Sequence, residues 1–145
     1  MSCIFCDIRD QKEPAYVILN EEHCLAILDT KPKTEGHILV IPKIHCEHFS
    51  ELDENTSAEM MKMALKVTGM IKASEIPTDG FNLFLTEAKA GGQVVPHVHL
   101  HVIPRLLHDG IRLSCLKKSL YKIHKENEMP INFSSIMRRV RNALN

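Results

Sequence analysis

The chain of 145 residues has no tryptophan, only two tyrosines and no net charge. None of its apolar runs approaches the roughly 18 residues that a membrane-spanning helix needs, so we expect no membrane partner. Zero net charge provides no general attraction for nucleic acid, so none is expected as a partner. The first residues hold no basic segment followed by an apolar stretch, which predicts no secretory signal and a cytoplasmic location.

The five cysteines are an odd number, at positions 3, 6, 24, 46 and 115. Without a secretory signal, this number disfavours a disulfide framework. Cys24 and Cys115 are interpreted as small apolar residues of the core or surface. Cys3 and Cys6 have the spacing of a zinc-ligand pair, although two free thiols near the N-terminus would give the same pattern.

The length and the apolar content of 44% fit one globular domain over residues 1–145. Short apolar runs between turn-forming residues predict five strands, over residues 16–19, 24–28, 37–41, 81–85 and 97–103. Pro42 and Pro104 are expected to end two of them. Helical spacing predicts a long helix over 57–73, with Thr56 and Glu59 as a capping box. Helical segments near 113–126 and 133–144 would follow. This order predicts an α+β fold with a mostly antiparallel sheet and a helix on one face.

Three histidines alternate in the fifth predicted strand: His97, His99 and His101. Alternation places their imidazoles on one face, about 7 Å apart, within reach of one phosphate or one metal ion. Neutral imidazole is a good nucleophile near pH 7, because its ordinary pKa is about 6.5. The pattern therefore predicts attack on phosphorus, with His99 as the nucleophile. A metal site and a chance run of histidines are the alternatives.

A glycine pair lies just upstream, in Ala90-Gly91-Gly92-Gln93. Because glycines have no side chain, the backbone N–H groups of such a loop approach an anion closely. Its place before the three histidines predicts a phosphate-binding loop beside their strand.

Residues 97–105 resemble the signature of the histidine triad (HIT) family of nucleotide-binding hydrolases and transferases. Residues 3–8, 26–29, 36–45 and 91–93 resemble further blocks of that family, in the same order. The resemblance covers about residues 3–105 and leaves about 106–145 as a C-terminal extension. It implies a five-stranded antiparallel sheet with one long helix, in a homodimer whose sheets join into ten strands.

The resemblance also implies a reaction. His99 would attack the α-phosphorus of a purine nucleoside phosphoramidate or dinucleoside polyphosphate, through a nucleotidyl-histidine intermediate that releases a nucleoside monophosphate such as AMP. The backbone carbonyl of His97 would hold the other ring nitrogen of His99, while His101 and His37 would surround the phosphate. The alternatives are a purine-nucleotide-binding module with vestigial catalysis that acts through a protein partner, and a zinc-stabilised scaffold dimer.

Several substrate contacts follow from the same resemblance. Gln93 and the backbone of Gly92 would cradle the phosphate, and Asp29 would accept hydrogen bonds from the ribose hydroxyls. Four apolar residues would line a pocket for the base, with core packing as their alternative role: Ile4, Phe5, Ile8 and Ile27. For His37, the alternative is a structural role in its strand.

Two positions depart from the family's pattern. Thr86 stands where the family usually has Asn or Gln, and Val94 where it usually has Ser or Thr. Both positions normally contact ribose or phosphate, and a lost hydrogen bond to a charged partner is worth about 1.5–3 kcal/mol. The departures leave the nucleophile in place and bear on substrate choice and turnover rate.

Some family members bind zinc through a cysteine pair, a histidine after a Pro-Lys and the first histidine of the triad. The matching residues here are Cys3, Cys6, His45 and His97. The resemblance therefore implies a structural zinc ion that pins the N-terminus to the sheet. His48 is an alternative ligand three residues after His45.

Overall fold

The computed structural model describes residues 3–111 and 132–143. Its five strands form one sheet in the order β1-β2-β3-β5-β4, and every pairing between neighbours is antiparallel. The strands are β1 (Val17–Asn20), β2 (Cys24–Leu28), β3 (Ile38–Pro42), β4 (Gly80–Leu85) and β5 (Leu100–Arg105). The predicted α+β class and five-stranded antiparallel sheet are confirmed.

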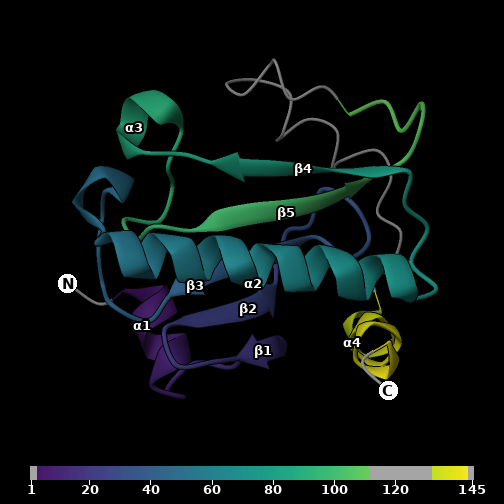
Figure 1. Cartoon of the computed structure of the whole chain (residues 1–145), viewed down its shortest axis with the longest axis horizontal. Helices are drawn as coiled ribbons and strands as arrows, with labels where there is room; N and C mark the ends of the chain where they lie inside the picture. The colour runs from purple at the N-terminus through teal and green to yellow at the C-terminus, as the bar shows by residue number, and fades with distance from the viewer. Residues whose placement is uncertain (1–2, 112–131, 144–145) are drawn as a thin grey trace.

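The long helix α2 (Glu54–Ala73) runs across one face of the sheet (Figure 1). Its N-cap is Asp53, whose carboxylate accepts a 2.8 Å hydrogen bond from the Thr56 backbone N–H and one of 2.7 Å from the Thr56 hydroxyl. The predicted cap at Thr56 is therefore wrong, and the helix begins three residues earlier. Asp is as good a cap as Thr, and its negative charge also interacts favourably with the helix N-terminus.

Alternating side chains of the strands divide the core into two layers. Residues such as Ala26 and Val40 face α2, whereas Leu39 and Ile41 face the opposite side. There the sheet is partly covered by α1 (Ile4–Arg9), which buries the ring of Phe5. This six-residue helix could not be expected from the sequence, because it is shorter than two helical turns and shows no helical period.

The helix α4 (Phe133–Asn142) confirms the second predicted segment of the C-terminal extension. Ile136 and Val140 bury against α2 and β1, and the Phe133 ring stacks on Tyr16 with centroids 5.1 Å apart. The other predicted segment, 113–126, and Cys115 lie outside the described residues. Within the described residues, no helix combines the length and apolarity needed to cross a membrane.

Both expected strand-ending prolines lie within strands. β3 includes Pro42 as its last residue, and β5 continues through Pro104, which pairs with Phe81, to Arg105. A proline near a strand end is tolerated where its missing N–H would not have joined the ladder. The predicted start of β5 is also wrong. The strand begins at Leu100, because the backbone N–H of Val98 donates to the carbonyl of Cys46, in the loop after β3.

Candidate active site and metal site

The nucleophile predicted from the sequence is oriented by its own backbone. His99 Nδ1 lies 2.7 Å from the backbone carbonyl oxygen of His97. A carbonyl only accepts, so Nδ1 carries the proton and Nε2 keeps its lone pair. The expected contact between this carbonyl and His99 is confirmed. Burial lowers the pKa of His99, opposed in part by this hydrogen bond, so the ring is neutral near pH 7.

A second chain of hydrogen bonds orients His101. The backbone N–H of Lys33 donates to His37 Nδ1 at 3.0 Å, which leaves the His37 proton on Nε2. That nitrogen lies 2.9 Å from His101 Nδ1 and donates to it. His101 therefore carries its own proton on Nε2. Burial, together with the neighbouring His37 and His99, lowers the pKa of His101 to about 3, so the ring is a neutral donor.

Asp29 follows β2 and adjoins these two rings. Its Oδ1 accepts a 2.8 Å hydrogen bond from the Lys31 backbone N–H. Its Oδ2 lies 3.6 Å from His37 Nδ1 and 4.0 Å from His101 Nδ1. Although a carboxylate and two imidazoles are a chemically reasonable ligand set for a metal, the direct bond between the two rings already engages the nitrogens that face each other.

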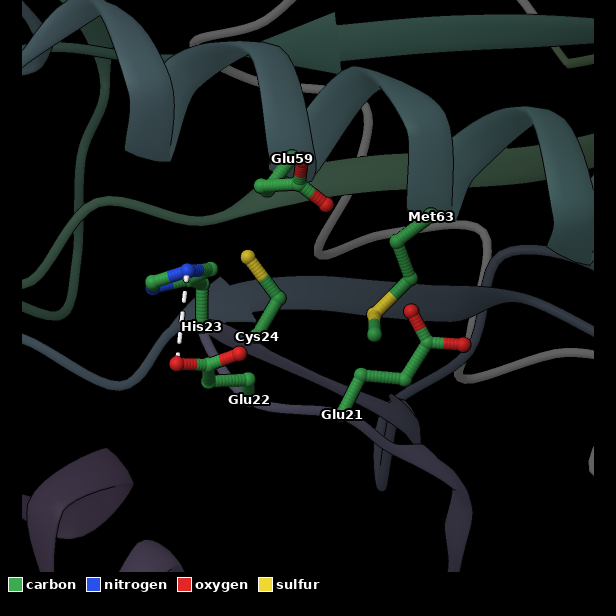
Figure 2. Close-up of a pocket in the computed structure, with 6 residues that line it drawn as sticks. All are labelled: Glu21, Glu22, His23, Cys24, Glu59 and Met63. Carbon is green, nitrogen blue, oxygen red and sulfur yellow. Dashed lines mark ion pairs between the residues drawn. The ribbon is translucent and has the colours of Figure 1, made fainter.

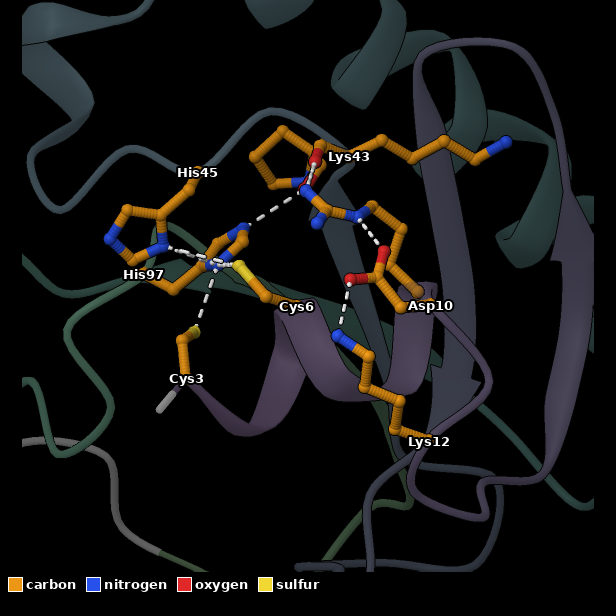
Figure 3. Close-up of polar contacts among 9 residues, drawn as sticks. Cys3, Cys6, Asp10, Lys12, Lys43, His45 and His97 are labelled. Atoms are coloured by element: carbon orange, nitrogen blue, oxygen red, sulfur yellow. Dashed lines mark hydrogen bonds and ion pairs between the residues drawn. The ribbon is translucent and has the colours of Figure 1, made fainter. Parts of the chain in front are cut away.

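The ring of His97 belongs to a different cluster. Its Nδ1 lies 3.3 Å from Cys3 Sγ, 3.7 Å from Cys6 Sγ and 3.3 Å from His45 Nδ1 (Figure 3). On its other side, His97 Nε2 donates to the carbonyl of Pro42 at 2.9 Å. The three triad rings are therefore divided between two sites, and the expectation that all three reach one phosphate or one metal is wrong.

We use the name clasp for a group of four residues, Cys3, Cys6, His45 and His97. The clasp fits a zinc ion. Four ligand atoms at zinc distances of about 2.0–2.3 Å in a tetrahedron are about 3.3–3.8 Å from one another. The described separations within the clasp, 3.3–3.7 Å, fall in that range. The Pro42 carbonyl fixes the His97 proton on Nε2, so Nδ1 presents its lone pair to the clasp. His45, and not the alternative His48, is in the group.

The expected base-pocket residues have different environments. Phe5 and Ile27 are buried in the apolar layer between α1 and the sheet, and Ile8 is half-buried beside them. Ile4 is 43% exposed. The Phe5 ring meets the rings of His97 and His99 edge-on, with centroids 5.7 and 5.3 Å away. The apolar layer thus adjoins the nucleophile, and Ile4 lies at its exposed margin.

The glycine loop is built around a short helix, α3 (Ala88–Gly91), and its polar groups are already paired. Gly92 ends the helix with a left-handed φ of 91°, and its N–H donates to the carbonyl of Lys89. The side chain of Gln93 accepts from the Ala88 N–H at 2.7 Å and donates to the Glu47 carbonyl at 2.8 Å. Val94, in contrast, is 90% exposed. Thr86, at the end of β4, is buried.

A cavity of about 260 Å³ lies elsewhere, between β2 and α2 (Figure 2). Its lining residues are Glu21, Glu22, His23, Cys24, Glu59 and Met63. Burial raises the pKa of the Cys24 thiol to about 11, so the thiol stays protonated and unreactive near pH 7. This cavity offers no chemistry comparable with that of the histidines.

The HIT domain family matches residues 10–108, most of the chain. This chain belongs to the HIT family. Its members are typically nucleotide hydrolases or transferases. Among the similar proteins is an uncharacterized HIT-like protein of Methanocaldococcus jannaschii, 40% identical over 108 residues, or 74% of this chain and 82% of that protein. The adenylylsulfatase HINT3 of Arabidopsis thaliana is 36% identical over 126 residues, or 86% of this chain and 63% of that protein.

A solved structure resembles this HIT protein over nearly its full length. It is a zinc-bound histidine triad family protein from Mycobacterium smegmatis, with a TM-score of 0.84, 33% sequence identity, and coverage of 99% of this chain and 94% of that one. A HIT-like protein from Bartonella henselae, solved with an unknown ligand, has a TM-score of 0.78 at 25% identity and covers 98% of this chain and 96% of that one.

Nothing in the sequence indicates the groups that fix two of the imidazole tautomers in this HIT protein. The carbonyl of Pro42 and the backbone N–H of Lys33 fix the ring protons of His97 and His37. Backbone groups leave no mark on side-chain identity, so no motif could have found them. The ring of Phe84, 6.0 Å from that of His101, was identified only as a strand residue.

Proposed function

We propose that this HIT protein is a nucleotide hydrolase in which His99 Nε2 attacks the α-phosphorus of its substrate. The hydrogen bond from His99 Nδ1 to the His97 carbonyl carries this proposal, because it leaves the lone pair on Nε2. A nucleophile of this kind needs a second group that orients it, and here the backbone provides it without a charge. The lowered pKa keeps the ring unprotonated near pH 7.

The proposed reaction has two steps. First, an N–P bond forms at His99 Nε2 while the bond from the α-phosphorus to the leaving group breaks. The leaving group takes a proton from solvent and accepts a hydrogen bond from the Nε2 proton of His101. The chain from Lys33 through His37 places that proton. Then water attacks the nucleotidyl-histidine and loses its proton to solvent, and a nucleoside monophosphate is released with His99 restored.

The substrates proposed are a purine nucleoside phosphoramidate or a dinucleoside polyphosphate. Both present an α-phosphorus next to a leaving group that gains from protonation. The similarity to an adenylylsulfatase adds a third leaving group, sulfate, on the same phosphorus. In each case AMP or another purine monophosphate is the expected product and ligand.

Asp29 and the buried layer under α1 are proposed to hold the nucleoside. One carboxylate oxygen of Asp29 is bonded to the Lys31 N–H, and the residue is part-exposed beside His101. Phe5 and Ile27 provide apolar surface next to the nucleophile. For Gly92 and Gln93 to cradle phosphate, the loop must exchange some of its present internal hydrogen bonds for the anion.

A nucleotide-binding module with weak catalysis, acting through a protein partner, is the second candidate. The observation that favours it is Val94, which is 90% exposed and whose side chain has no polar atom to offer a phosphate. Incubation with an adenosine phosphoramidate, a diadenosine polyphosphate and adenylyl sulfate, followed by product analysis, decides between the two. Formation of AMP supports the hydrolase. Binding of AMP without cleavage of any of the three supports the module and overturns the hydrolase.

We also propose that the clasp binds a structural zinc ion. The two thiols and two imidazoles complete a four-ligand shell, which leaves no open position for substrate. The solved relative from Mycobacterium smegmatis is zinc-bound, which supports the proposal. Cys3 and Cys6 form no disulfide, which is compatible with the proposed reducing, cytoplasmic location. Elemental analysis of the purified chain tests it, and less than half an ion per chain after zinc supplementation would contradict it.

We propose, finally, a homodimer in which two sheets join through β4. The β1 edge is covered by α4, and Arg141 donates to the Val17 carbonyl there. β4 forms the other edge, and its Leu83 is 47% exposed. Such an edge favours pairing with a second strand. Light scattering of the wild type and of Leu83→Lys tests this, with a dimer expected for the first and a monomer for the second; a monomeric wild type would contradict it.

A further inference from the structure

The clasp and the nucleophile share one residue. The imidazole of His97 belongs to the clasp, and its backbone carbonyl accepts the hydrogen bond of His99 Nδ1. We propose that the clasp positions the nucleophile: it holds the imidazole of His97, and the carbonyl of His97 in turn holds His99. This inference rests on the proposed nucleotide hydrolysis, and it gives the clasp a role in catalysis beyond pinning the N-terminus.

The peptide unit that joins His97 to Val98 carries the first link. A peptide unit is planar, so its C=O and N–H groups point in opposite directions. The N–H of Val98 donates to the carbonyl of Cys46 at 2.8 Å, and the C=O of His97 accepts from His99 Nδ1 on the other side. A rotation of this plane would break both bonds. The plane thus fixes which ring nitrogen of His99 carries the proton.

The clasp restrains that plane from two sides. His45, a clasp residue, immediately precedes Cys46, whose carbonyl accepts the Val98 N–H. The ring of His97 is held between the clasp and the Pro42 carbonyl, 2.9 Å from Nε2. Because the His97 ring and the Cys46 carbonyl that accepts the Val98 N–H are both restrained, the His97 carbonyl can point only toward His99.

Phe5 makes a second link, through side chains. It lies between Cys3 and Cys6 in the first turn of α1, so both thiols of the clasp determine where its ring lies. The Arg9 side chain also ties the end of α1 to the Lys43 carbonyl at 2.7 Å. Phe5 is buried and meets the His99 ring edge-on. Phe5 therefore restricts the ring rotation of His99, while the carbonyl fixes its proton.

The test uses the full chain, with Cys3→Ala/Cys6→Ala as the clasp variant and Cys24→Ala as the matched control. Cys24 is a buried thiol in the other core layer, so its loss reduces stability without touching the clasp. Bound zinc, AMP affinity and the nucleotidylation rate at saturating substrate are measured for each chain. Long-range proton–nitrogen NMR spectra of histidine-labelled protein report the tautomer of His99, assigned with His99→Asn.

We expect the wild type and Cys24→Ala to show His99 with its proton on Nδ1. The clasp variant should show averaging between the two tautomers of His99. Its nucleotidylation rate should fall by about 10–100-fold, the usual loss when a group that orients a ligand is removed. Phe5→Leu should keep zinc and the tautomer but slow the same step. A folded clasp variant with the wild-type His99 signal overturns the inference, as does an equal change in Cys24→Ala.

The outcomes separate this inference from the functions on which it rests. If the wild type cleaves none of the substrates, the proposed hydrolase fails, while the NMR comparison still decides whether the clasp orients His99. If the wild type takes up no zinc, the metal proposal fails. The NMR comparison of the wild type with the clasp variant still decides whether the clasp orients His99.

Discussion

His37 Nε2 lies 2.9 Å from His101 Nδ1, although the two residues are 64 positions apart in the chain. β3 and β5 are neighbours in the sheet, and their pairing brings the two rings together. Because the Lys33 N–H occupies the other nitrogen of His37, the bond has one direction, from His37 to His101. This relationship makes His37 a positioning residue for the proton on His101 Nε2.

His37→Phe should therefore slow the cleavage step by about 10²-fold, in the range of a lost preorganised hydrogen-bond donor. The variant removes the donor, so the proton of His101 is free to move to Nδ1. The effect should shrink for a nucleotide ester with p-nitrophenol as leaving group, because its anion needs less stabilisation by a hydrogen-bond donor. Single-turnover kinetics on both substrates measures it. An equal loss on the two would contradict the role of His101 in stabilising the leaving group.

His99→Ala should abolish turnover, because no other imidazole in the described structure has its lone pair fixed on Nε2 by a backbone carbonyl. His99→Asn should still bind AMP, since its amide preserves a polar group of similar reach. Mass spectrometry of wild type mixed briefly with substrate should detect a nucleotidyl adduct that both variants lack. Turnover by His99→Ala at the wild-type rate would refute the assignment of the nucleophile.

The stability of the protein should fall with acid below about pH 6.5, in part because of His101. Its folded pKa is about 3, below the ordinary value near 6.5, so the unfolded chain binds this proton first. The contribution is fully present above the unfolded pKa and is lost as the pH falls toward the folded one, by up to about 1.4 kcal/mol per pH unit. Urea unfolding at pH 7.5 and 5.0 should show a smaller pH effect in His101→Gln. An identical pH effect in both would exclude His101 as a source.

Removal of zinc should lower the thermal stability. A ligand that binds only the folded state at a free concentration of about 100 times its Kd stabilises it by about 2.7 kcal/mol. Chelation should lower the Tm of the wild type and of Cys46→Ala, whose thiol contacts the His48 carbonyl outside the clasp. Cys3→Ala should begin with the lower Tm and respond little. Calorimetry with and without chelator tests this, and no shift in the wild type would contradict it.

The helix cap offers a test of the fold that is independent of the site. Asp53→Ala should destabilise the chain by about 1 kcal/mol, because it removes the acceptor for the first turn of α2. Glu59→Gln, at the position predicted to complete the cap, should have a smaller effect, since Glu59 is paired with Lys62. Denaturant unfolding distinguishes the two, and a larger loss for Glu59→Gln would restore the capping box predicted from the sequence.

The residues of the candidate site could be predicted from the sequence, but their separation into two clusters could not. The clasp, for example, comprises the four residues expected as ligands, and the His97 carbonyl contacts His99 as expected. The alternation of the histidines, however, suggested three rings around one ligand. The ring of His97 instead belongs to the clasp, because the chain around it is bonded to the loop after β3 and has not yet entered β5.

Features that depend on side-chain identity and spacing could be predicted from the sequence: the apolar runs of β2 and β3, the long helix, the histidine row and the family. Contacts that depend on backbone groups from distant segments could be identified only in the folded chain. Three such backbone groups act at the site. The Pro42 carbonyl and the Lys33 N–H fix the ring protons of His97 and His37, and the Cys46 carbonyl holds the peptide plane between His97 and Val98. Every residue carries the same backbone groups, so their partners become defined only when the chain folds.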